Sequence, residues 1–375
     1  MKFIVSSTFL LKNLQAVSGV LISNSSLPIL NDFLFDLSGD NLKITTSDIE
    51  TTMTISLQVS MAAESGIVAV PAKILIETLK TLPDVPVTFT VDPITLGIEI
   101  VAGEGKYKMN GHNGEDFPET PVIDEGNEFT INSIALSEAI SKTVFAVGID
   151  EMRPVMTGVL MEINPEFVSF VATDAHKLVR YQRFNIGVDL EDSIILPTKP
   201  LNQIKNLLGV EDQDVKIIYD QKNIAFEFGR VRLISKLIEG KYPNYAAVIP
   251  SDNPNKMQIE RMPLLNAIRR VSIFGNQSTH QLRLSISNRT LQLSAEDIDY
   301  ANEAREDLNC NYNGEDMDIG FNSKFLLEML ANLDTEEVLF EFSQPNRAGL
   351  IKQIVDEEVV DKDILMLIMP LMLND

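Results

Sequence analysis

The sequence predicts an α+β protein made of three tandem copies of one module, each with two helices packed on largely antiparallel sheets. Two observations lead to this fold class. Four landmarks recur in the same order at a period of about 125 residues, which is the sequence signature of a repeat. Each copy also contains two amphipathic helical segments among many short segments with period-two alternation, a pattern typical of α+β folds.

The first landmark is an amphipathic helix at the start of each copy. Apolar residues recur there at helical spacing, which predicts helices over residues 8–18, 136–146 and 262–272. The apolar stripes are Leu10, Leu11, Leu14 and Val17, then Leu136, Ile140, Val144 and Val147, then Leu264, Leu265, Ile268 and Val271. Alternating strands follow the helix in the first and third copies, such as Phe33, Phe35 and Leu37.

The second landmark is an acidic signature at a strand end, which is SDIE, TDAH and EDID in the three copies. Its aspartates are Asp48, Asp174 and Asp297. An aspartate at this place commonly accepts hydrogen bonds from its own turn, while paired carboxylates also carry out hydrolysis. Because the repeat supplies only one such aspartate per module, we favour the structural role.

The third and fourth landmarks close each module. Strands lead into a second helix at VPAK from Val70, LPTK from Leu196 and GFNSK from Gly320. An aromatic residue or methionine then precedes Pro118, Pro243 and Pro370. Turn-rich stretches at residues 124–127 and 251–254 separate the copies. The predicted domains are therefore 1–126, 127–253 and 254–375.

Charge is unevenly distributed along the chain. The formal net charge is −23, but the six predicted helices hold nine basic and three acidic residues, which leaves −29 for the remainder. The basic residues are Lys12, Lys73, Lys80, Lys142, Lys199, Lys205, Arg269, Arg270 and Lys324. A basic helical surface on an acidic protein favours contact with phosphate, although lysines that only solvate exposed helices would give the same pattern.

Patterns that would carry catalysis or a metal are weak. His112, His176 and His280 have no metal-ligand spacing, and Cys310 is the only cysteine. The AGEGKY stretch lacks the remaining residues of a phosphate loop and predicts a hairpin turn. The sequence therefore predicts no metal, no cofactor and no enzyme activity. It contains no apolar run long enough to span a membrane and no signal peptide, so we expect a cytoplasmic protein.

Several motifs resemble the bacterial DNA polymerase III beta subunit, the sliding clamp, along essentially the whole chain. They are VSG and SSLPIL within 17–30, VPAK from Val70, ATDAHKL from Ala172, SKLIEGKYPNY from Ser235, IGFN from Ile319 and the terminal IMPLML. The resemblance implies three DNA-clamp domains per subunit and a head-to-tail homodimer that forms a ring around duplex DNA. It also implies that the ring binds short peptides of the polymerase III alpha subunit, the clamp loader, other polymerases and repair proteins.

The resemblance assigns residues to three surfaces. The peptide-binding cleft would comprise Met156, Thr173, Ala175, His176, Lys177, Leu178, Pro243, Val248, Asn322, Leu367, Ile368, Met369, Pro370, Leu371, Met372 and Leu373. The DNA-facing residues would be the nine basic helix residues together with Asn24. The dimer interface would contain Tyr107, Met109, Ile273 and Phe274.

The sequence departs from the family pattern at a few of these positions. Ala175, His176 and Lys177 stand where the family has Gly-His-Arg, Asn24 replaces an arginine, and Met372 replaces a basic residue. Asn374 and Asp375 extend the chain beyond the usual terminal leucine. These changes affect the expected peptide preference and DNA contact. Two alternatives to a clamp remain: an acidic protein-interaction scaffold, and a hydrolase that uses the repeated aspartates.

Overall fold

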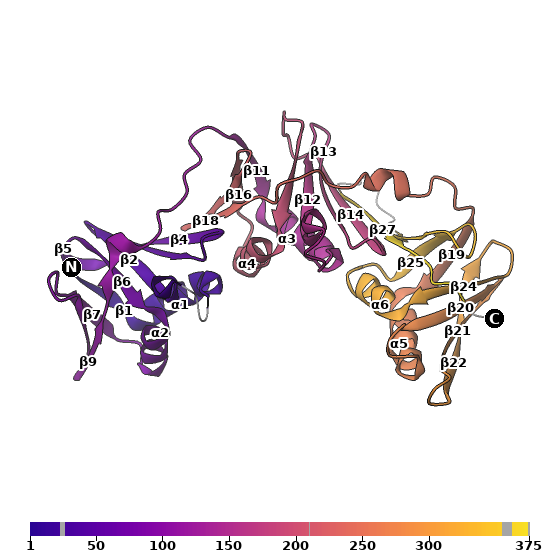
Figure 1. The fold of residues 1–375 in the computed structure, drawn as a ribbon, viewed down its shortest axis with the longest axis horizontal. Coiled ribbons are helices and arrows are strands. Elements are labelled where there is room, and N and C mark those ends of the chain that lie inside the picture. The colour runs from indigo at the N-terminus through magenta and orange to yellow at the C-terminus, as the bar shows by residue number, and fades with distance from the viewer. Residues whose placement is uncertain (23–26, 210, 355–361, 374–375) are drawn as a thin grey trace. The chain divides into compact units, whose positions relative to one another are not determined.

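Two compact units make up the described chain. The computed structural model describes all residues except 23–26, 210, 355–361 and 374–375. Unit 1 contains Met1–Ile134 and Lys199–Leu237, and unit 2 contains Ala135–Thr198 and Ile238–Asp375. Each unit consists of two antiparallel sheets and the helices that pack on them (Figure 1).

Unit 1 contains a five-stranded and a nine-stranded sheet. The five-stranded sheet has the order β5 (Ser60–Glu64), β1 (Lys2–Ser6), β7 (Pro86–Val91), β8 (Gly97–Ala102) and β9 (Gly105–Asn110). The nine-stranded sheet has the order β10 (His112–Asn113), β6 (Gly66–Pro71), β2 (Asp32–Ser38), β3 (Asn41–Ser47), β4 (Thr51–Gln58), β18 (Val231–Lys236), β17 (Asn223–Phe228), β16 (Asp214–Tyr219) and β11 (Asn127–Asn132).

An aromatic cluster joins the two sheets of unit 1. Phe3 of β1 and Phe89 of β7 stack with ring centroids 5.1 Å apart, and Phe35 of β2 lies 5.4 Å from Phe89. All three rings are fully buried. Alternation along β2 points Phe33, Phe35 and Leu37 into this core, as the sequence predicts.

Unit 2 contains a nine-stranded and a four-stranded sheet. The nine-stranded sheet has the order β15 (Asp192–Pro197), β12 (Gly158–Ile163), β13 (Phe167–Thr173), β14 (Lys177–Phe184), β27 (Lys362–Ile368), β26 (Gly349–Gln353), β25 (Glu337–Phe342), β19 (Asn255–Glu260) and β23 (Asn311–Tyr312). The four-stranded sheet has the order β22 (Asn302–Asn309), β21 (Thr290–Asp297), β20 (Gln281–Ser287) and β24 (Met317–Asn322). Phe321 of β24 and Phe342 of β25 stack between these sheets, with centroids 6.2 Å apart.

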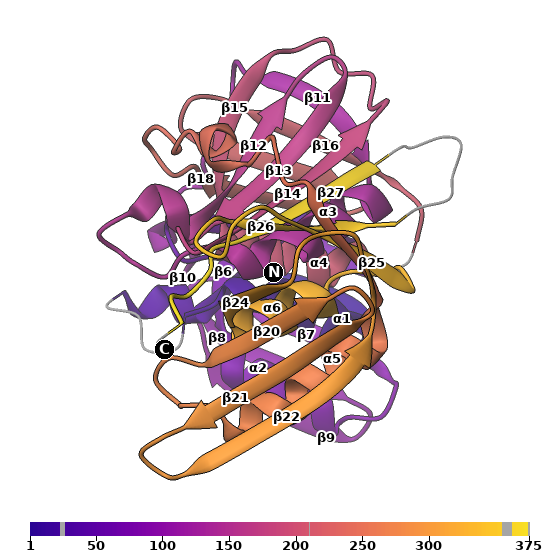
Figure 2. The same ribbon diagram turned by 90° about the vertical axis from the view of Figure 1, so that its right-hand side faces the viewer.

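The described residues form six α-helices, at the predicted places. They are α1 (Ser7–Val17), α2 (Ala72–Thr81), α3 (Ser133–Thr143), α4 (Thr198–Leu208), α5 (Arg261–Val271) and α6 (Ser323–Ala331). In unit 1, α1 packs on α2, and in unit 2, α5 packs on α6 and on β21 and β22 (Figure 2). None of the helices in the described part of the chain is long and apolar enough to cross a bilayer.

The largest difference from a predicted helix boundary is in α3. This helix starts three residues before the predicted Leu136, and its predicted last turn, Val144–Ala146, is a 3-10 turn. Asn132 explains the start, because its Oδ1 accepts a hydrogen bond of 2.9 Å from the Ile134 amide. Asn322 caps α6 in the same way, with a 3.0 Å bond from the Lys324 amide. Such caps satisfy amides that have no partner within the helix.

Both nine-stranded sheets continue across the predicted module limits. β4 of the first module pairs with β18 of the second, and β14 of the second pairs with β27 of the third. The middle module therefore contributes strands to both units. Alternation along single strands cannot reveal these two seams, since it specifies which face of a strand is buried but not which strand lies beside it.

Candidate functional site

Unit 2 contains an apolar groove with a volume of about 610 Å³. It lies beside the seam between β14 and β27, under the loop that connects β18 to β19. Nine of the predicted cleft residues line it: Met156, Thr173, Ala175, Lys177, Leu178, Pro243, Val248, Leu367 and Met369. The structure thus brings together side chains from the second and third modules that lie far apart in the sequence.

The floor of the groove is a solid apolar cluster. Leu178 of β14 is paired with Leu367 of β27, which is in turn paired with Leu350 of β26, and all three are buried. The walls are more accessible, because Val248 and Met369 are 54% and 40% exposed. A flexible methionine at the rim of a buried floor suits a site that accepts apolar side chains of different shapes.

The overlying loop is held to the sheet by two tyrosines. Tyr242 donates a hydrogen bond of 3.4 Å to the Val171 carbonyl, and Tyr245 donates one of 2.5 Å to Glu162 Oε2. Burial raises the pKa of both phenols, so both stay protonated and keep donating at neutral pH. The loop is therefore a preformed wall of the groove.

The turn between β13 and β14 carries the acidic signature of the second module. Asp174 Oδ1 accepts hydrogen bonds of 2.8 Å from the amides of His176 and Lys177. Ala175 lies between them with a left-handed φ of +79°. Glycine adopts this conformation freely, whereas alanine there costs about 1 kcal/mol because its Cβ approaches the following carbonyl.

Asp48 and Asp297 also accept bonds from their own turns. Asp48 Oδ1 accepts from the amides of Glu50 and Thr51 at 3.0 and 2.6 Å, and Asp297 Oδ1 accepts from the Asp299 amide at 3.1 Å. These contacts match the structural role that we favoured for the repeated aspartates. In the described ranges of the chain, no group of three or more His, Cys, Asp or Glu residues could hold a metal ion.

Lys177 is part of the structure of the turn and also lines the groove. Its side chain is buried, its Nζ is bound to Glu328 and it lies 3.9 Å from Asp174 Oδ2. The same Nζ lies 4.8 Å from the centre of the Phe325 ring, while the His176 ring stacks on Phe325 at 6.4 Å. Charge pairing and the cation–π contact with Phe325 hold β14 against α6.

The C-terminal segment after β27 is tied to unit 2 by two backbone bonds. The Met369 amide donates to the His176 carbonyl and the Leu371 amide donates to the Gly320 carbonyl, both at 2.8 Å. A Cβ at Gly320 would lie 2.8 Å from the Leu371 carbonyl oxygen, so only glycine allows this close approach. Leu371, Met372 and Leu373 line a smaller cavity of about 220 Å³ next to Gly320.

Four predicted cleft residues line neither cavity. They are His176, Asn322, Ile368 and Pro370. Ile368 is fully buried in β27, and Asn322 is the cap of α6. Eight groove residues were not predicted: Asn244, Tyr245, Ala247, Ile249, Pro250, Asn346, Arg347 and Ala348. The stretch between Pro243 and Pro250 is a turn-rich signal that could have indicated the first five, and the SQPNRAG turn before β26 is a comparable signal for the other three.

The predicted DNA-facing residues differ in exposure. Lys12, Lys73, Lys80, Lys199, Arg269, Arg270 and Lys324 are exposed, Lys205 is partly buried, and Asn24 lies outside the described residues. Arg270 is bound to Glu306 and Lys199 to Asp48.

The structure removes Lys142 from the predicted DNA-facing residues. Its side chain is only 9% exposed, and its Nζ donates a 2.7 Å hydrogen bond to the Asn332 carbonyl and is bound to Asp334. A buried ammonium needs such partners, since leaving it unpaired is costly. Lys142 thus fastens α3 to the end of α6 and cannot reach a phosphate.

The four predicted dimer-interface residues occupy two places. Tyr107 and Met109 lie on the same face of β9, two residues apart. This strand is at the edge of the five-stranded sheet of unit 1. Ile273 and Phe274 form the 3-10 turn after α5 in unit 2 and are 69% and 42% exposed. Large apolar side chains exposed next to one another are typical of contact surfaces.

Three family models match consecutive parts of the chain. They are models of the three domains of the DNA polymerase III beta subunit. The N-terminal domain model matches residues 1–121, the central domain model matches 130–244, and the C-terminal domain model matches 246–371. The prediction of three tandem clamp domains with antiparallel sheets is therefore confirmed.

Individual relatives agree with this result. The beta sliding clamp of Pseudomonas aeruginosa is 31% identical over 364 residues, which cover 96% of this chain and 97% of that protein. The crystal structure of a sliding clamp from that organism bound to griselimycin has a TM-score of 0.94 at 30% identity, and the Bacillus subtilis clamp has 0.94 at 25%, each covering 100% of both chains. This chain belongs to the DNA polymerase III beta subunit family, the bacterial beta sliding clamps.

Proposed function

We propose that two copies of this chain close head to tail into a ring around duplex DNA and tether DNA polymerase III to it. The proposal rests on the likeness to sliding clamps over the full length of the chain, at a TM-score of 0.94. The family is a non-catalytic processivity factor, so tethering takes the place of catalysis. The domain limits 1–126, 127–253 and 254–375 are part of the proposal, as is a location in the cytoplasm.

The charge of the helices supports their placement at the DNA. Without the buried Lys142, the six described helices carry nine Lys and Arg residues and three Glu residues, a net charge of +6 in a chain of net charge −23. A mildly basic surface holds the phosphate backbone without reading its sequence, and weak contacts of this kind allow sliding. The acidic remainder keeps other surfaces off the DNA.

The groove of unit 2 supports the recruitment of partners. Its apolar floor and exposed rim suit a short peptide with large apolar side chains, which would come from the polymerase III alpha subunit, the clamp loader, or other polymerases and repair proteins. Lys177 lines this groove, and Met372 lines the smaller cavity next to Gly320. We therefore expect this protein to prefer different peptides from relatives that have a basic residue at the position of Met372.

Loading onto circular DNA tests encirclement directly. The protein is loaded by its clamp loader onto a nicked circle and isolated with the DNA by gel filtration. We expect it to stay on the closed circle and to leave once a restriction enzyme cuts the circle, because a ring slides off free ends. Retention after cutting would contradict a topological link. An acidic scaffold, the second candidate, predicts no retention on either form.

Substitutions of two lysines in unit 2 distinguish a residue that contacts DNA from one that stabilises the fold. We expect Lys324→Gln to lower the affinity for duplex DNA roughly twofold to threefold at low salt, because Lys324 is exposed at the start of α6. Lys142→Gln should leave DNA affinity unchanged but lower the free energy of unfolding by about 1–3 kcal/mol, since it removes the partner of the Asn332 carbonyl and of Asp334 from a buried position. Fluorescence anisotropy and urea unfolding measure the two quantities. A DNA defect in K142Q as large as that in K324Q would refute the correction made above.

A further inference from the structure

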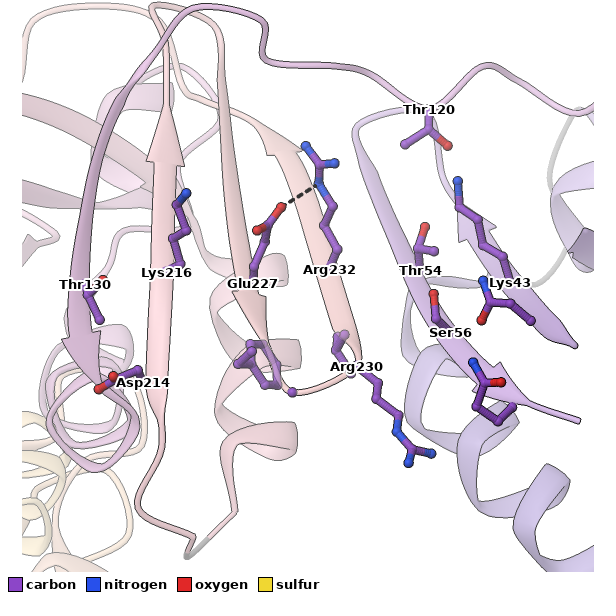
Figure 3. Close-up of a pocket in the computed structure, with 15 residues that line it drawn as sticks. Lys43, Thr54, Ser56, Thr120, Thr130, Asp214, Lys216, Glu227, Arg230 and Arg232 are labelled. Carbon is purple, nitrogen blue, oxygen red and sulfur yellow. Dashed lines mark ion pairs between the residues drawn. The ribbon is translucent and has the colours of Figure 1, made fainter. Parts of the chain in front are cut away.

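A second cavity, of about 690 Å³, lies in unit 1 at the seam between β4 and β18. Figure 3 shows its lining, which comes from the strands on both sides of this seam and from Thr120 on the connecting loop above them. Most of the lining side chains are polar or charged. Neither the dimer contacts nor the groove of unit 2 uses any of them, so this polar groove has no role in the proposed function.

Direct cross-strand partners make the lining a continuous row. Lys43 is opposite Ser56, and Thr54, two residues earlier on the same strand, is opposite Arg232. Glu227 is opposite Arg232 on one side and Lys216 on the other. Directly paired residues point to the same face of a sheet, so the row crosses five strands on one face.

The cations of the row are incompletely neutralised. Arg232 Nε lies 3.3 Å from Glu227 Oε1 and makes no hydrogen bond, and Lys216 Nζ lies 2.7 Å from Glu128 Oε2. Lys43 and Arg230 have no ion pair with any residue that the structure describes. The lining holds four basic residues against Asp214 and Glu227, and Glu128 beside it pairs with Lys216, so the net charge of the groove is +1 on a protein of net charge −23.

The polar groove and the apolar groove lie at corresponding seams of the two units. The apolar groove of unit 2 lies at β14–β27 and the polar groove of unit 1 lies at β4–β18, and in both a strand of one module pairs with a strand of the next. Leu178 and Leu367 are opposite one another in the lining at the second seam, and Arg232 is opposite Thr54 in the lining at the first. The two pairs are not at matching positions, because the 126-residue spacing of Asp48 and Asp174 matches Leu178 with Thr52, which is opposite Ile234. The same architecture therefore presents an apolar surface at one seam and a cationic surface at the other.

We propose that the polar groove of unit 1 binds an extended peptide segment that carries two or more Asp or Glu side chains. Lys43, Arg230 and the free donors of Arg232 would receive the carboxylates, since guanidinium and carboxylate groups form charge-assisted hydrogen bonds. The hydroxyl groups of Ser56 and Thr130 along the same row would bond the peptide backbone.

Nucleic acid fits this groove less well than an acidic peptide. Asp214 and Glu227 would lie close to a phosphate backbone, whose charges are evenly spaced and would meet them wherever the strand lay. Single strands also bind by stacking bases on aromatic rings, and the aromatic residue of the lining, Phe228, is buried. A peptide can place its carboxylates at the cations and leave uncharged residues at Glu227.

Peptide binding to the full chain tests this proposal. The probe is a fluorescein-labelled ten-residue peptide of alternating Glu and Ser, and its matched control alternates Gln and Ser. We expect the Glu peptide to bind more tightly, and the Lys43→Gln, Arg230→Gln double variant to weaken it roughly threefold to tenfold. Glu227→Gln should strengthen binding, because it removes a carboxylate and frees Arg232. Fluorescence anisotropy at low ionic strength gives the dissociation constants.

A matched variant controls for net charge. Lys2 and Lys222 are exposed in unit 1 outside the groove, so Lys2→Gln, Lys222→Gln changes the net charge equally and should leave binding within twofold. Equal weakening by both double variants would overturn the proposal, as would equal affinity for the Glu and Gln peptides. A third result would also overturn it: a twenty-nucleotide oligothymidylate that binds the parent protein more tightly than the Glu peptide does, and that binds the Lys43→Gln, Arg230→Gln variant only weakly.

Discussion

Replacing Ile273 and Phe274 by aspartate should convert the proposed dimer into a monomer that does not stay on DNA. Both side chains are large and exposed in the turn after α5. Burying such a side chain at an interface stabilises it by roughly 2 kcal/mol, and burying an unpaired carboxylate instead adds a further cost. A head-to-tail ring of two subunits contains the same junction twice, so each substitution acts twice.

Solution mass is the measurement for this variant. A subunit has a mass of 41.8 kDa, so sedimentation should show twice that value for the parent and a single subunit for the variant. The control is Val122→Asp, Ile149→Asp, which places two aspartates at apolar positions that are also exposed and should leave the mass unchanged. A variant that keeps the parent mass would remove Ile273 and Phe274 from the interface.

Ending the chain after Ile368 should abolish peptide binding and leave the fold intact. β27 ends at Ile368, which keeps its pairing with Lys177 and Gly349, so the sheet is complete without the segment that follows. Truncation removes Met369 from the groove and Leu371 from its bond to Gly320. Losing this wall of the groove together with the segment that carries it should weaken binding about tenfold to a hundredfold.

Anisotropy with a labelled peptide from the polymerase III alpha subunit measures the effect. Truncation after Leu373, which removes only Asn374 and Asp375, is the matched control and should bind as the parent does. Gly320→Val is a second variant, because its side chain would clash with the Leu371 carbonyl and detach the segment without shortening the chain. Parent-like affinity of the chain ending at Ile368 would show that the segment is not part of the binding site.

The predicted secondary structure agrees closely with the observed one because its signals are local. The stripe of Leu264, Leu265, Ile268 and Val271 is the buried face of α5, and the alternation of Leu282, Leu284 and Ile286 is the buried face of β20. Both patterns follow from the geometry of a single element. The bounds predicted for the first helix of the middle module are less accurate. The Asn132 cap and the final 3-10 turn depend on hydrogen bonds that periodicity does not encode.

Exposure of charged residues could not be predicted in the same way. Lys142 and Lys324 are both helical lysines, yet one is fastened to Asp334 and the other is exposed. Which of them is free depends on what the neighbouring loop places beside it. Arg232 and Glu227 are another case, since their pairing across β17 and β18 appears only once the strands are in register.

By itself the sequence determined the three-module repeat, the two helices of each module, the resemblance to a sliding clamp and nine of the residues that line the apolar groove. Only the tertiary structure decided that the sheets run on through β4–β18 and β14–β27, and hence that one seam is apolar and the other cationic. The physical reason is that periodicity is set by neighbours along the chain, whereas a groove is made by side chains that strand pairing brings together across long sequence distances.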